Sequence, residues 1–226
     1  MVLEIAVFDL ASAFIAENAG ADRIELCHDY SSGGVTVSNE VLVSVKERIS
    51  IPVFPIIRPR SGDFVYTDEE YEQIKSAVLL CKSLGYKGIV TGILNSDHTV
   101  NTIQISEIVQ MAFPMEVTFH RAFDATAEPE KALEDIINCG CKRILTSGCK
   151  NTAAEGIDLL KKLVVLANGR ISIMPGGGIR PTNLPDLLKT NATEFHSAAF
   201  KKENNQLSID IAYIQAMKSI LTKKSL

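Results

Sequence analysis

The regular alternation of short strands rich in valine and isoleucine with longer helical patterns is the feature that most constrains the fold of this chain. Eight such pairs follow one another, and no linker or low-complexity segment interrupts them. Strands that alternate with helices pair in parallel through right-handed crossovers, so each pair is one βα unit. The expected strands are residues 3–8, 23–27, 53–58, 88–93, 116–120, 143–146, 171–175 and 193–197.

Eight βα units favour an α/β fold with a single closed (β/α)8 TIM barrel that spans residues 1–226. Barrels of this type have about 250 residues, so a chain of 226 residues would form a compact one. An open doubly wound sheet is the alternative. The glycine-rich turn argues against that sheet, because residues 176–178 follow the seventh strand and no G-x-G-x-x-G follows the first.

Alternation within the strands predicts a polar barrel interior. Leu3, Ile5 and Val7 suit the side that faces the helices, which leaves Glu4 on the inner side. The same reasoning places these residues inside: Arg23, Glu25, Cys27, Glu116, Thr118, His120, Glu194 and His196. Buried charges must be paired and hydrogen-bonded. We therefore expect a polar network in the interior, at least in its upper layers, towards the carboxyl ends of the strands.

Composition and charge exclude several classes of function. The net charge of −4 argues against broad binding to nucleic acid or to anionic membranes, which needs a basic face. No apolar run approaches the roughly 20 residues that span a bilayer, and the first ten residues lack the basic region of a secretory signal. The five cysteines are irregularly spaced and predict reduced thiols in a cytoplasmic protein rather than a disulfide framework.

Ionisable residues at the carboxyl ends of the expected strands are the candidate catalytic groups. The segment from Glu116 to Asp124 delivers His120 and Arg121 to the end of the fifth strand, where barrels of this type keep their sites. His120 suits acid–base chemistry because its ordinary pKa lies near neutrality. Glu25 suits a general base, and Asp124 completes the candidate set. The alternative for Glu25 and His120 is a structural role in the interior network.

Arginines and glycines near the same strand ends predict an anion site. Two guanidinium groups, Arg58 and Arg60, flank the stiff Pro59, and such groups grip carboxylate or phosphate with paired hydrogen bonds. The alternative is that they bridge interior glutamates. Glycine-rich loops after the seventh strand add backbone amides. The candidate anion-binding residues are Arg58, Arg60, Arg121, Ser147, Gly148, Gly176, Gly177, Gly178 and His196.

Standard catalytic motifs are absent from the sequence. No G-x-S-x-G, H-E-x-x-H or P-loop occurs. No lysine follows a strand directly, which weakens the case for an aldolase that forms a Schiff base. The reaction class therefore stays open from motifs alone.

Several motifs together resemble the CutC family, long labelled copper homeostasis proteins. They are GADRIELC (20–27), IRPRSGDFVYTDEE (57–70), TFHRAFD (118–124), RILTSG (143–148), GRISIMPGGGI (169–179) and ATEFHSAA (192–199). The resemblance implies a TIM barrel, a cytoplasmic location and a homodimer or larger homo-oligomer. It also implies copper binding through the cysteine of the ELC motif, here Cys27. Thiolate suits Cu(I) and imidazole suits Cu(II), so the copper ligands that this chain could group are Cys27 with His120 or His196.

Three functions remain open from the sequence. The first is copper handling, with copper ion as cofactor or cargo. The second is an enzyme that acts on a small anionic substrate, bearing phosphate or carboxylate, at the C-terminal mouth of the barrel. The third is a catalytically silent barrel that acts through its oligomer surface. We expect neither nucleic acid nor membrane as a partner.

Overall fold

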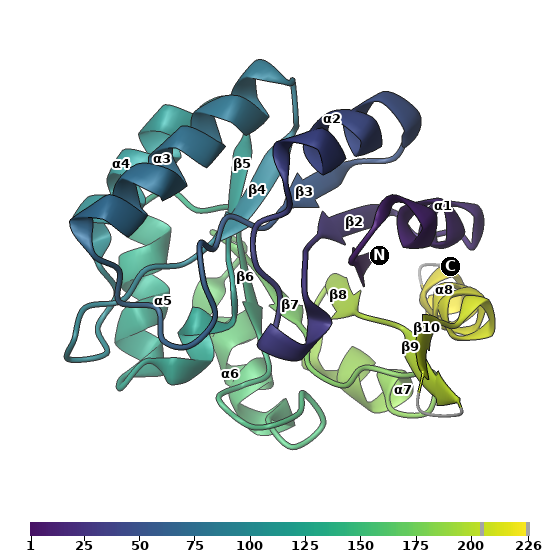
Figure 1. The fold of residues 1–226 in the computed structure, drawn as a ribbon. Helices are drawn as coiled ribbons and strands as arrows, with labels where there is room; N and C mark the ends of the chain where they lie inside the picture. The colour runs from purple at the N-terminus through teal and green to yellow at the C-terminus, as the bar shows by residue number, and fades with distance from the viewer. Residues whose placement is uncertain (204–205, 225–226) are drawn as a thin grey trace.

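Strands form the centre of the computed structural model and helices surround them (Figure 1). The structure describes residues 1–203 and 206–224. The central strands are β1 (Val2–Val7), β2 (Arg23–Leu26), β3 (Val53–Pro55), β4 (Gly88–Thr91), β5 (Glu116–Phe119), β6 (Arg143–Thr146), β7 (Ser172–Pro175) and β8 (Glu194–Ser197). The α-helices are α1 (Leu10–Asn18), α2 (Asn39–Arg48), α3 (Asp68–Ser83), α4 (Thr102–Ala112), α5 (Pro129–Asn138), α6 (Ile157–Ala167), α7 (Leu184–Leu187) and α8 (Ile211–Lys224). Short 3₁₀ turns are η1 (Tyr30–Ser32), η2 (Arg121–Ala125) and η3 (Leu188–Thr190).

The central strands pair in parallel, in the order expected of a (β/α)8 barrel. One sheet runs β3-β2-β1-β8 and the other runs β4-β5-β6-β7. A parallel bridge between Ile56 and Val90 joins the two sheets, and the amide of Ile57 donates to the Val90 carbonyl at 2.7 Å. On the opposite side β7 packs beside β8. The predicted α/β barrel is therefore confirmed.

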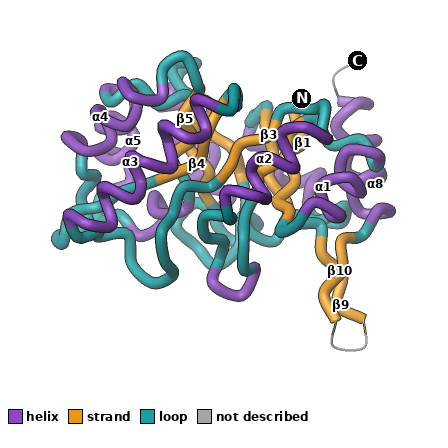
Figure 2. Tube along the Cα trace, turned by 45° about the horizontal axis from the view of Figure 1, so that its top comes forward, coloured by secondary structure: helices purple, strands orange, loops and turns teal. Residues whose placement is uncertain are grey.

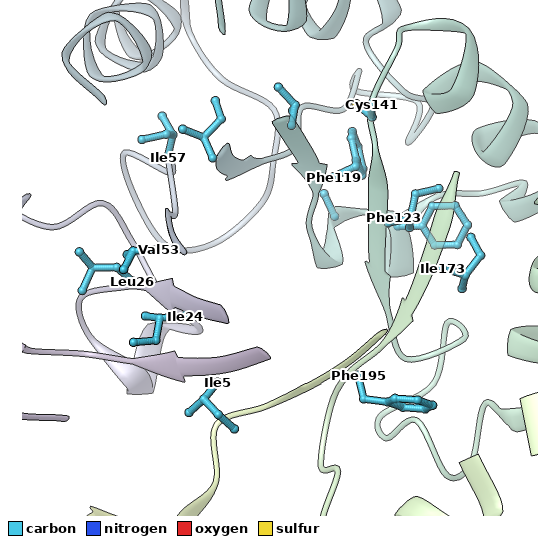
Figure 3. Packing of buried hydrophobic residues seen from close by; sticks show 14 of the residues in the cluster. Ile5, Ile24, Leu26, Val53, Ile57, Phe119, Phe123, Cys141, Ile173 and Phe195 are labelled. Carbon is cyan, nitrogen blue, oxygen red and sulfur yellow. The ribbon is translucent and has the colours of Figure 1, made fainter. Parts of the chain in front are cut away.

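Apolar side chains fill the space between the strands and the surrounding helices. Figure 3 shows several of them, including Ile5, Ile24, Leu26, Phe119 and Ile173, on the strands of both sheets. All five are almost fully buried, and burying each stabilises the fold by roughly 1.5–3 kcal/mol. The alternation that assigned apolar strand residues to the helix-facing side is confirmed.

The N-terminal half of the barrel interior is an ionic network. The Glu194 carboxylate accepts hydrogen bonds from Arg23 at 2.5 Å and from Arg143 at 2.8 Å. Both guanidinium groups lie over the ring of Phe54, at 5.1 and 5.3 Å from its centroid. Arg23 also donates to Glu4, which is fully buried, at 2.5 Å. The polar interior is thus confirmed, but its densest ion pairing lies at the amino ends of the strands, below the layers where we expected it.

Gly88 on β4 leaves space for the Phe54 ring, over which the two arginine side chains lie. A Cβ atom at Gly88 would lie 2.4 Å from the Phe54 ring. That separation is far inside van der Waals contact, so the ring occupies the place of a β4 side chain. Gly88 is therefore a packing requirement of the ionic layer.

The last third of the chain departs from the expected elements. A hairpin of β9 (Phe200–Glu203) and β10 (Gln206–Ile209) projects beyond the barrel before α8 (Figure 2). We expect a helix from residue 209 on the sequence alone, but Ile209 ends the second strand of this hairpin. The sequence pattern also predicts a helix from about residue 153 to residue 167. Helix α6 begins at Ile157 instead, because the Ala153 amide donates to the Gly177 carbonyl at 2.9 Å and holds a turn there.

Helix lengths bear on one of the excluded classes. Within residues 1–203 and 206–224, no helix is both long enough and apolar enough to cross a bilayer.

The ionic network predicts that removing a buried cation lowers the free energy of unfolding more than removing an exposed one. Arg23→Met would leave the buried Glu4 and Glu194 short of a partner, so we expect a loss of roughly 3 kcal/mol or more in the free energy of unfolding. The matched change Lys162→Met removes an exposed pair with Glu130, and we expect about 1 kcal/mol or less. Urea unfolding followed by circular dichroism measures both. Equal losses would contradict a stabilising interior network.

Candidate functional site

A pocket of about 100 Å³ lies at the carboxyl ends of the strands, above the ionic network. Most of its lining residues come from strands or strand ends, and the rest from the loops that follow β2 and β3. The lining comprises Glu25, Gly33, Ile56, Arg58, Phe64, His120, Arg121, Leu145 and His196. Five candidate residues from the sequence, Glu25, Arg58, His120, Arg121 and His196, therefore converge at one place.

The orientation of His196 is set by a carboxylate from below. Glu4 Oε1 lies 2.8 Å from His196 Nδ1. Burial alone would raise the pKa of Glu4, but the charge of Arg23 and the bond to His196 outweigh it and hold this pKa at about 2. Because the ionised carboxylate can only accept, Nδ1 carries the hydrogen. The other ring nitrogen, Nε2, then faces Glu25 Oε2 at 3.7 Å.

Glu25 and His196 form a buried pair in which the pKa of each group is raised. Burial raises the pKa of Glu25, and the nearby charge of Glu4 adds to this, against the effect of His196. Burial alone would lower the pKa of His196, but the carboxylates of Glu25 and Glu4 outweigh it, so this pKa is raised. Acid–base groups work best when their pKa values lie near the working pH, and the rise in the pKa of Glu25 is in that direction. The pair is therefore suited to proton transfer.

His120 is a neutral hydrogen-bond donor. Its Nδ1 accepts the backbone amide of Ala122 at 3.2 Å, which requires a lone pair on Nδ1. Burial and the neighbouring charge of Arg58 lower the pKa of His120 to about 3, so the ring stays neutral. The single ring hydrogen must then sit on Nε2. That atom is buried and has no hydrogen-bond partner in the described part of the chain.

Arg58 is a buried cation that faces backbone carbonyls instead of a carboxylate. Its terminal nitrogens donate to the carbonyls of Ser32, Gly34 and Gly62 at 2.9–3.1 Å. Its Nε has no hydrogen-bond partner, and no acidic side chain among residues 1–203 and 206–224 forms an ion pair with it. The guanidinium lies 4.9 Å over the ring of Phe64. A positive charge held in this way favours an anion in the adjoining pocket.

Arg121 is placed at the pocket mouth by Asp124 and Ser147. Asp124 accepts from Arg121 Nε at 2.7 Å, and Ser147 Oγ accepts from the same guanidinium at 2.9 Å. Asp124 also accepts from the Thr146 hydroxyl at 2.5 Å and from the amide of Cys149 at 3.1 Å. Its oxygens are thus occupied by structural bonds. In this structure Asp124 positions Arg121, and Ser147 helps to hold it.

Arg60 and Gly148 lie outside the pocket lining. Arg60 forms ion pairs with Glu70 at 2.6 Å and with Asp63 at 2.9 Å on the outer side of the loop after β3. The Gly148 amide donates to the hydroxyl of Thr146 at 2.9 Å and so is already satisfied. Neither group is brought towards the other candidate residues.

The glycine run after β7 lies beside the pocket and is required for close packing. A Cβ atom at Gly176 would lie 2.4 Å from Leu145 Cδ1. At Gly177, where φ is +97°, it would lie 3.5 Å from the guanidinium carbon of Arg121. Gly178 is exposed and also has a positive φ. These glycines let the β7 loop approach Arg121, and they do not line the pocket themselves.

The expected copper ligands do not form a metal-binding group. Cys27 is buried and its thiol lies 3.4 Å from Glu25 Oε2; burial and this carboxylate raise its pKa well above the ordinary value. His120 Nε2 carries the hydrogen while the Ala122 amide occupies Nδ1, so this ring offers no free lone pair. Nowhere in the described ranges do three or more His, Cys, Asp or Glu side chains gather as a metal site would need. The set of Cys27, His120 and His196 does not fit copper in this arrangement.

Two residues with clear roles in the site were not identified from the sequence. Glu4 was expected inside the barrel, but its bond to His196 depends on the pairing of β1 with β8, where these residues are register partners. Phe64 covers His120 with a ring-centroid distance of 5.0 Å. The first could have been found by aligning inner positions of the first and last strands. The second lies in an irregular loop and has no such signal.

Comparison with known proteins places these residues in a family. The CutC family model matches residues 1–201. A human protein called "Copper homeostasis protein cutC homolog" is 46% identical over 199 residues, which cover 88% of this chain and 73% of the human one. A CutC protein of Klebsiella pneumoniae is 46% identical over 198 residues, covering 88% of this chain and 80% of that protein. The crystal structure of CutC from Streptococcus agalactiae superposes with a TM-score of 0.83 at 30% identity, covering 88% of this chain and 98% of that one.

The geometry at His120 predicts one tautomer over a wide pH range. With a pKa of about 3, the ring should stay neutral from pH 5 upwards, with hydrogen on Nε2 and a bare Nδ1. Long-range proton–nitrogen NMR of the histidine rings distinguishes the three protonation states. A His120 signal that titrates near pH 6–7, or that shows hydrogen on Nδ1, would contradict the assigned donor.

Proposed function

This chain belongs to the CutC family, and from that premise and the pocket geometry we propose that it binds a small anionic molecule at the C-terminal mouth of the barrel and moves a proton on it. The anion bears a carboxylate or a phosphate. Arg58, His120 and Arg121 hold the anion, and Glu25 with His196 transfers the proton. In this proposal the protein is an enzyme.

Two buried donors without partners among the described residues, on side chains that line one cavity, carry this proposal. Arg58 Nε and His120 Nε2 are buried, have no partner among the described residues, and belong to side chains that line the same pocket. Leaving a buried polar group unpaired costs roughly 1–3 kcal/mol, and more for a charged one. A ligand with negatively charged oxygens would satisfy both donors, which supports an anion as the natural occupant.

The acid–base part follows from the carboxylate–imidazole–carboxylate series of Glu4, His196 and Glu25. Glu4 fixes the tautomer and orientation of the imidazole, as an orienting carboxylate does in other catalytic sites. His196 Nε2 lies 3.7 Å from Glu25 Oε2, so in this proposal a proton passes between them once a bridging group or a small closure joins the two atoms. A substrate in this pocket would meet a proton acceptor, Glu25, and anion donors that line the same cavity.

Direct copper binding is suggested by the names of relatives, one of which is called a copper homeostasis protein. Copper(I) prefers soft thiolate and thioether ligands. Cys27 is held as a thiol beside Glu25, and His120 presents an N–H instead of a lone pair. The donor geometry therefore favours the anion over the metal. A role in copper homeostasis that does not require a copper site in this barrel is compatible with the proposed chemistry.

The cytoplasmic location and the homodimer or larger homo-oligomer stay predictions from the family resemblance. The same holds for the expected lack of nucleic-acid and membrane partners, which follows from the net charge of −4.

Anion binding is tested with two arginine variants that differ only in position. We expect calorimetry or NMR titration to show binding of inorganic phosphate or 2-oxobutanoate to the wild type. Arg121→Met should weaken it by roughly 10-fold or more, because a charge-assisted hydrogen bond is lost. Arg60→Met should bind as the wild type does, since Arg60 pairs with Glu70 and Asp63 outside the pocket. Equal effects of the two changes, or no binding at all, would refute the anion site.

Copper binding is tested by titrating Cu(I) into the wild type and Cys27→Ala, with folding checked by circular dichroism. We expect the same affinity for both proteins, because Cys27 does not join a metal-binding group. A loss of roughly 10-fold or more in Cys27→Ala would reinstate the thiol as a ligand.

A further inference from the structure

We propose that this pocket enolises a small carbonyl compound that carries an anionic group, with Glu25 as the base and His120 as the donor to the carbonyl oxygen. The inference rests on the anion site proposed above and adds the reaction class, namely removal of a proton from the carbon next to a carbonyl. It accounts for four lining groups at once: a neutral imidazole donor, a buried guanidinium, a buried carboxylate and an exposed arginine.

His120 has the properties that an enolate requires of its donor. The Ala122 amide fixes the hydrogen on Nε2, and that atom is buried without a partner in the residues that the structure describes. The side chain is only 4% exposed, and the ring of Phe64 covers it. A neutral imidazole is a weak acid, so it stabilises the developing negative oxygen by a hydrogen bond without protonating it fully.

Arg58 adds positive charge beside the same donor. It stands close enough to lower the pKa of His120, and its Nε lacks a hydrogen-bond partner among the described residues. The adjoining walls include Ile56, Phe64 and Leu145, which exclude water and strengthen charge–charge interactions. Together the two groups form a preorganised site for an oxygen that gains negative charge in the transition state.

Glu25 is the carboxylate placed to take the proton. Its Oε2 faces the Cys27 thiol at 3.4 Å and His196 Nε2 at 3.7 Å, while no donor within the described ranges reaches Oε1. The side chain is 5% exposed and lines the pocket with His120 and Arg58. A desolvated carboxylate is a stronger base than one in water, which suits removal of a carbon-bound proton.

The proposed step balances without an oxidant, a reductant or a second substrate. Glu25 removes the proton, and the C–H bonding pair forms a double bond to the carbonyl carbon. The carbonyl π pair moves to oxygen, where His120 and Arg58 hold it. Glu25 or His196 returns a proton to the same carbon. The product is therefore the original compound or its mirror form at that carbon.

Other covalent routes lack their reacting group in this pocket. Among the described residues, no lysine, serine or threonine lines this pocket. The pocket therefore lacks the amine that forms a Schiff base and the hydroxyl that forms an acyl-enzyme. Cys27 follows the carboxyl end of β2 and is not among the lining residues, and burial and the Glu25 carboxylate keep it a thiol, whereas nucleophilic attack needs the thiolate. Proton abstraction uses only groups that are present.

The size of the pocket restricts the substrate. A volume of about 100 Å³ holds roughly three water molecules, which suits the reacting end of a short carbonyl compound. A wider cavity of about 520 Å³ adjoins it at Arg121 and is also bordered by Lys150. Asp124 and Glu155 also line this cavity, so an anionic tail of carboxylate or phosphate would lie on its Arg121 and Lys150 side.

Deuterium exchange tests the reaction class directly. The purified full-length protein is mixed in D₂O with 2-oxobutanoate, oxaloacetate or dihydroxyacetone phosphate, and proton NMR follows loss of the signal next to the carbonyl. We expect the wild type to exchange at least one of these probes 100-fold faster than buffer. Glu25→Gln should lower that rate by roughly 10²–10⁴-fold. His120→Phe should lower it by roughly 10²–10³-fold, and His120→Gln, which keeps an N–H donor, should recover part of it.

Controls separate failure of this inference from failure of the anion site. His98→Asn changes a histidine in the loop after β4, outside the pocket, and should exchange at the wild-type rate. Probes that bind the wild type in calorimetry but do not exchange would overturn enolisation and leave the anion site intact. Exchange that survives Glu25→Gln or His120→Phe unchanged would also overturn it. Absence of both binding and exchange for every probe would overturn both proposals.

Discussion

The ionic layer at the amino ends of the strands and the pocket at their carboxyl ends both depend on the bonds that the fully buried Glu4 carboxylate makes. The carboxylate binds Arg23 in the ionic layer below and His196 at the floor of the pocket above. A charge at this depth is tolerable only with such partners. The same contacts that satisfy it also fix the tautomer of His196, so stability of the interior and chemistry of the mouth share one residue. A change at Glu4 would therefore disturb both.

Charged groups are paired at one end of the barrel interior and leave donors unpaired at the other. At the amino ends of the strands, Arg23 and Arg143 share Glu194 and stack on Phe54, so cations and carboxylates are matched. At the carboxyl ends, Arg58 has only carbonyl acceptors and His120 Nε2 has no acceptor within the described chain. Unmatched donors at one end of an otherwise paired interior are what a binding site for an anion requires.

The barrel itself was predictable because strand and helix periods differ and each recurs through the chain. The convergence of Glu25, His120 and His196 followed from their positions at strand ends, which all lie on one face of a parallel barrel. The individual roles were not predictable. Arg60 and Arg58 are two residues apart, yet loop geometry sends one to Glu70 and the other into the pocket. The donor state of His120 depends on a single backbone amide in η2. The sequence pattern places the last helix from Ile209, whereas Ile209 ends β10 and the helix begins at Ile211.

The most direct measurement of the central claim is a high-resolution crystal structure of the protein with bound 2-oxobutanoate or phosphate. An occupied pocket should show an anion oxygen within hydrogen-bond distance of both Arg58 Nε and His120 Nε2, in the cavity that Glu25 also lines. An empty pocket at saturating ligand, or an anion bound only at the outer Arg60 with Glu70 displaced, would contradict the account.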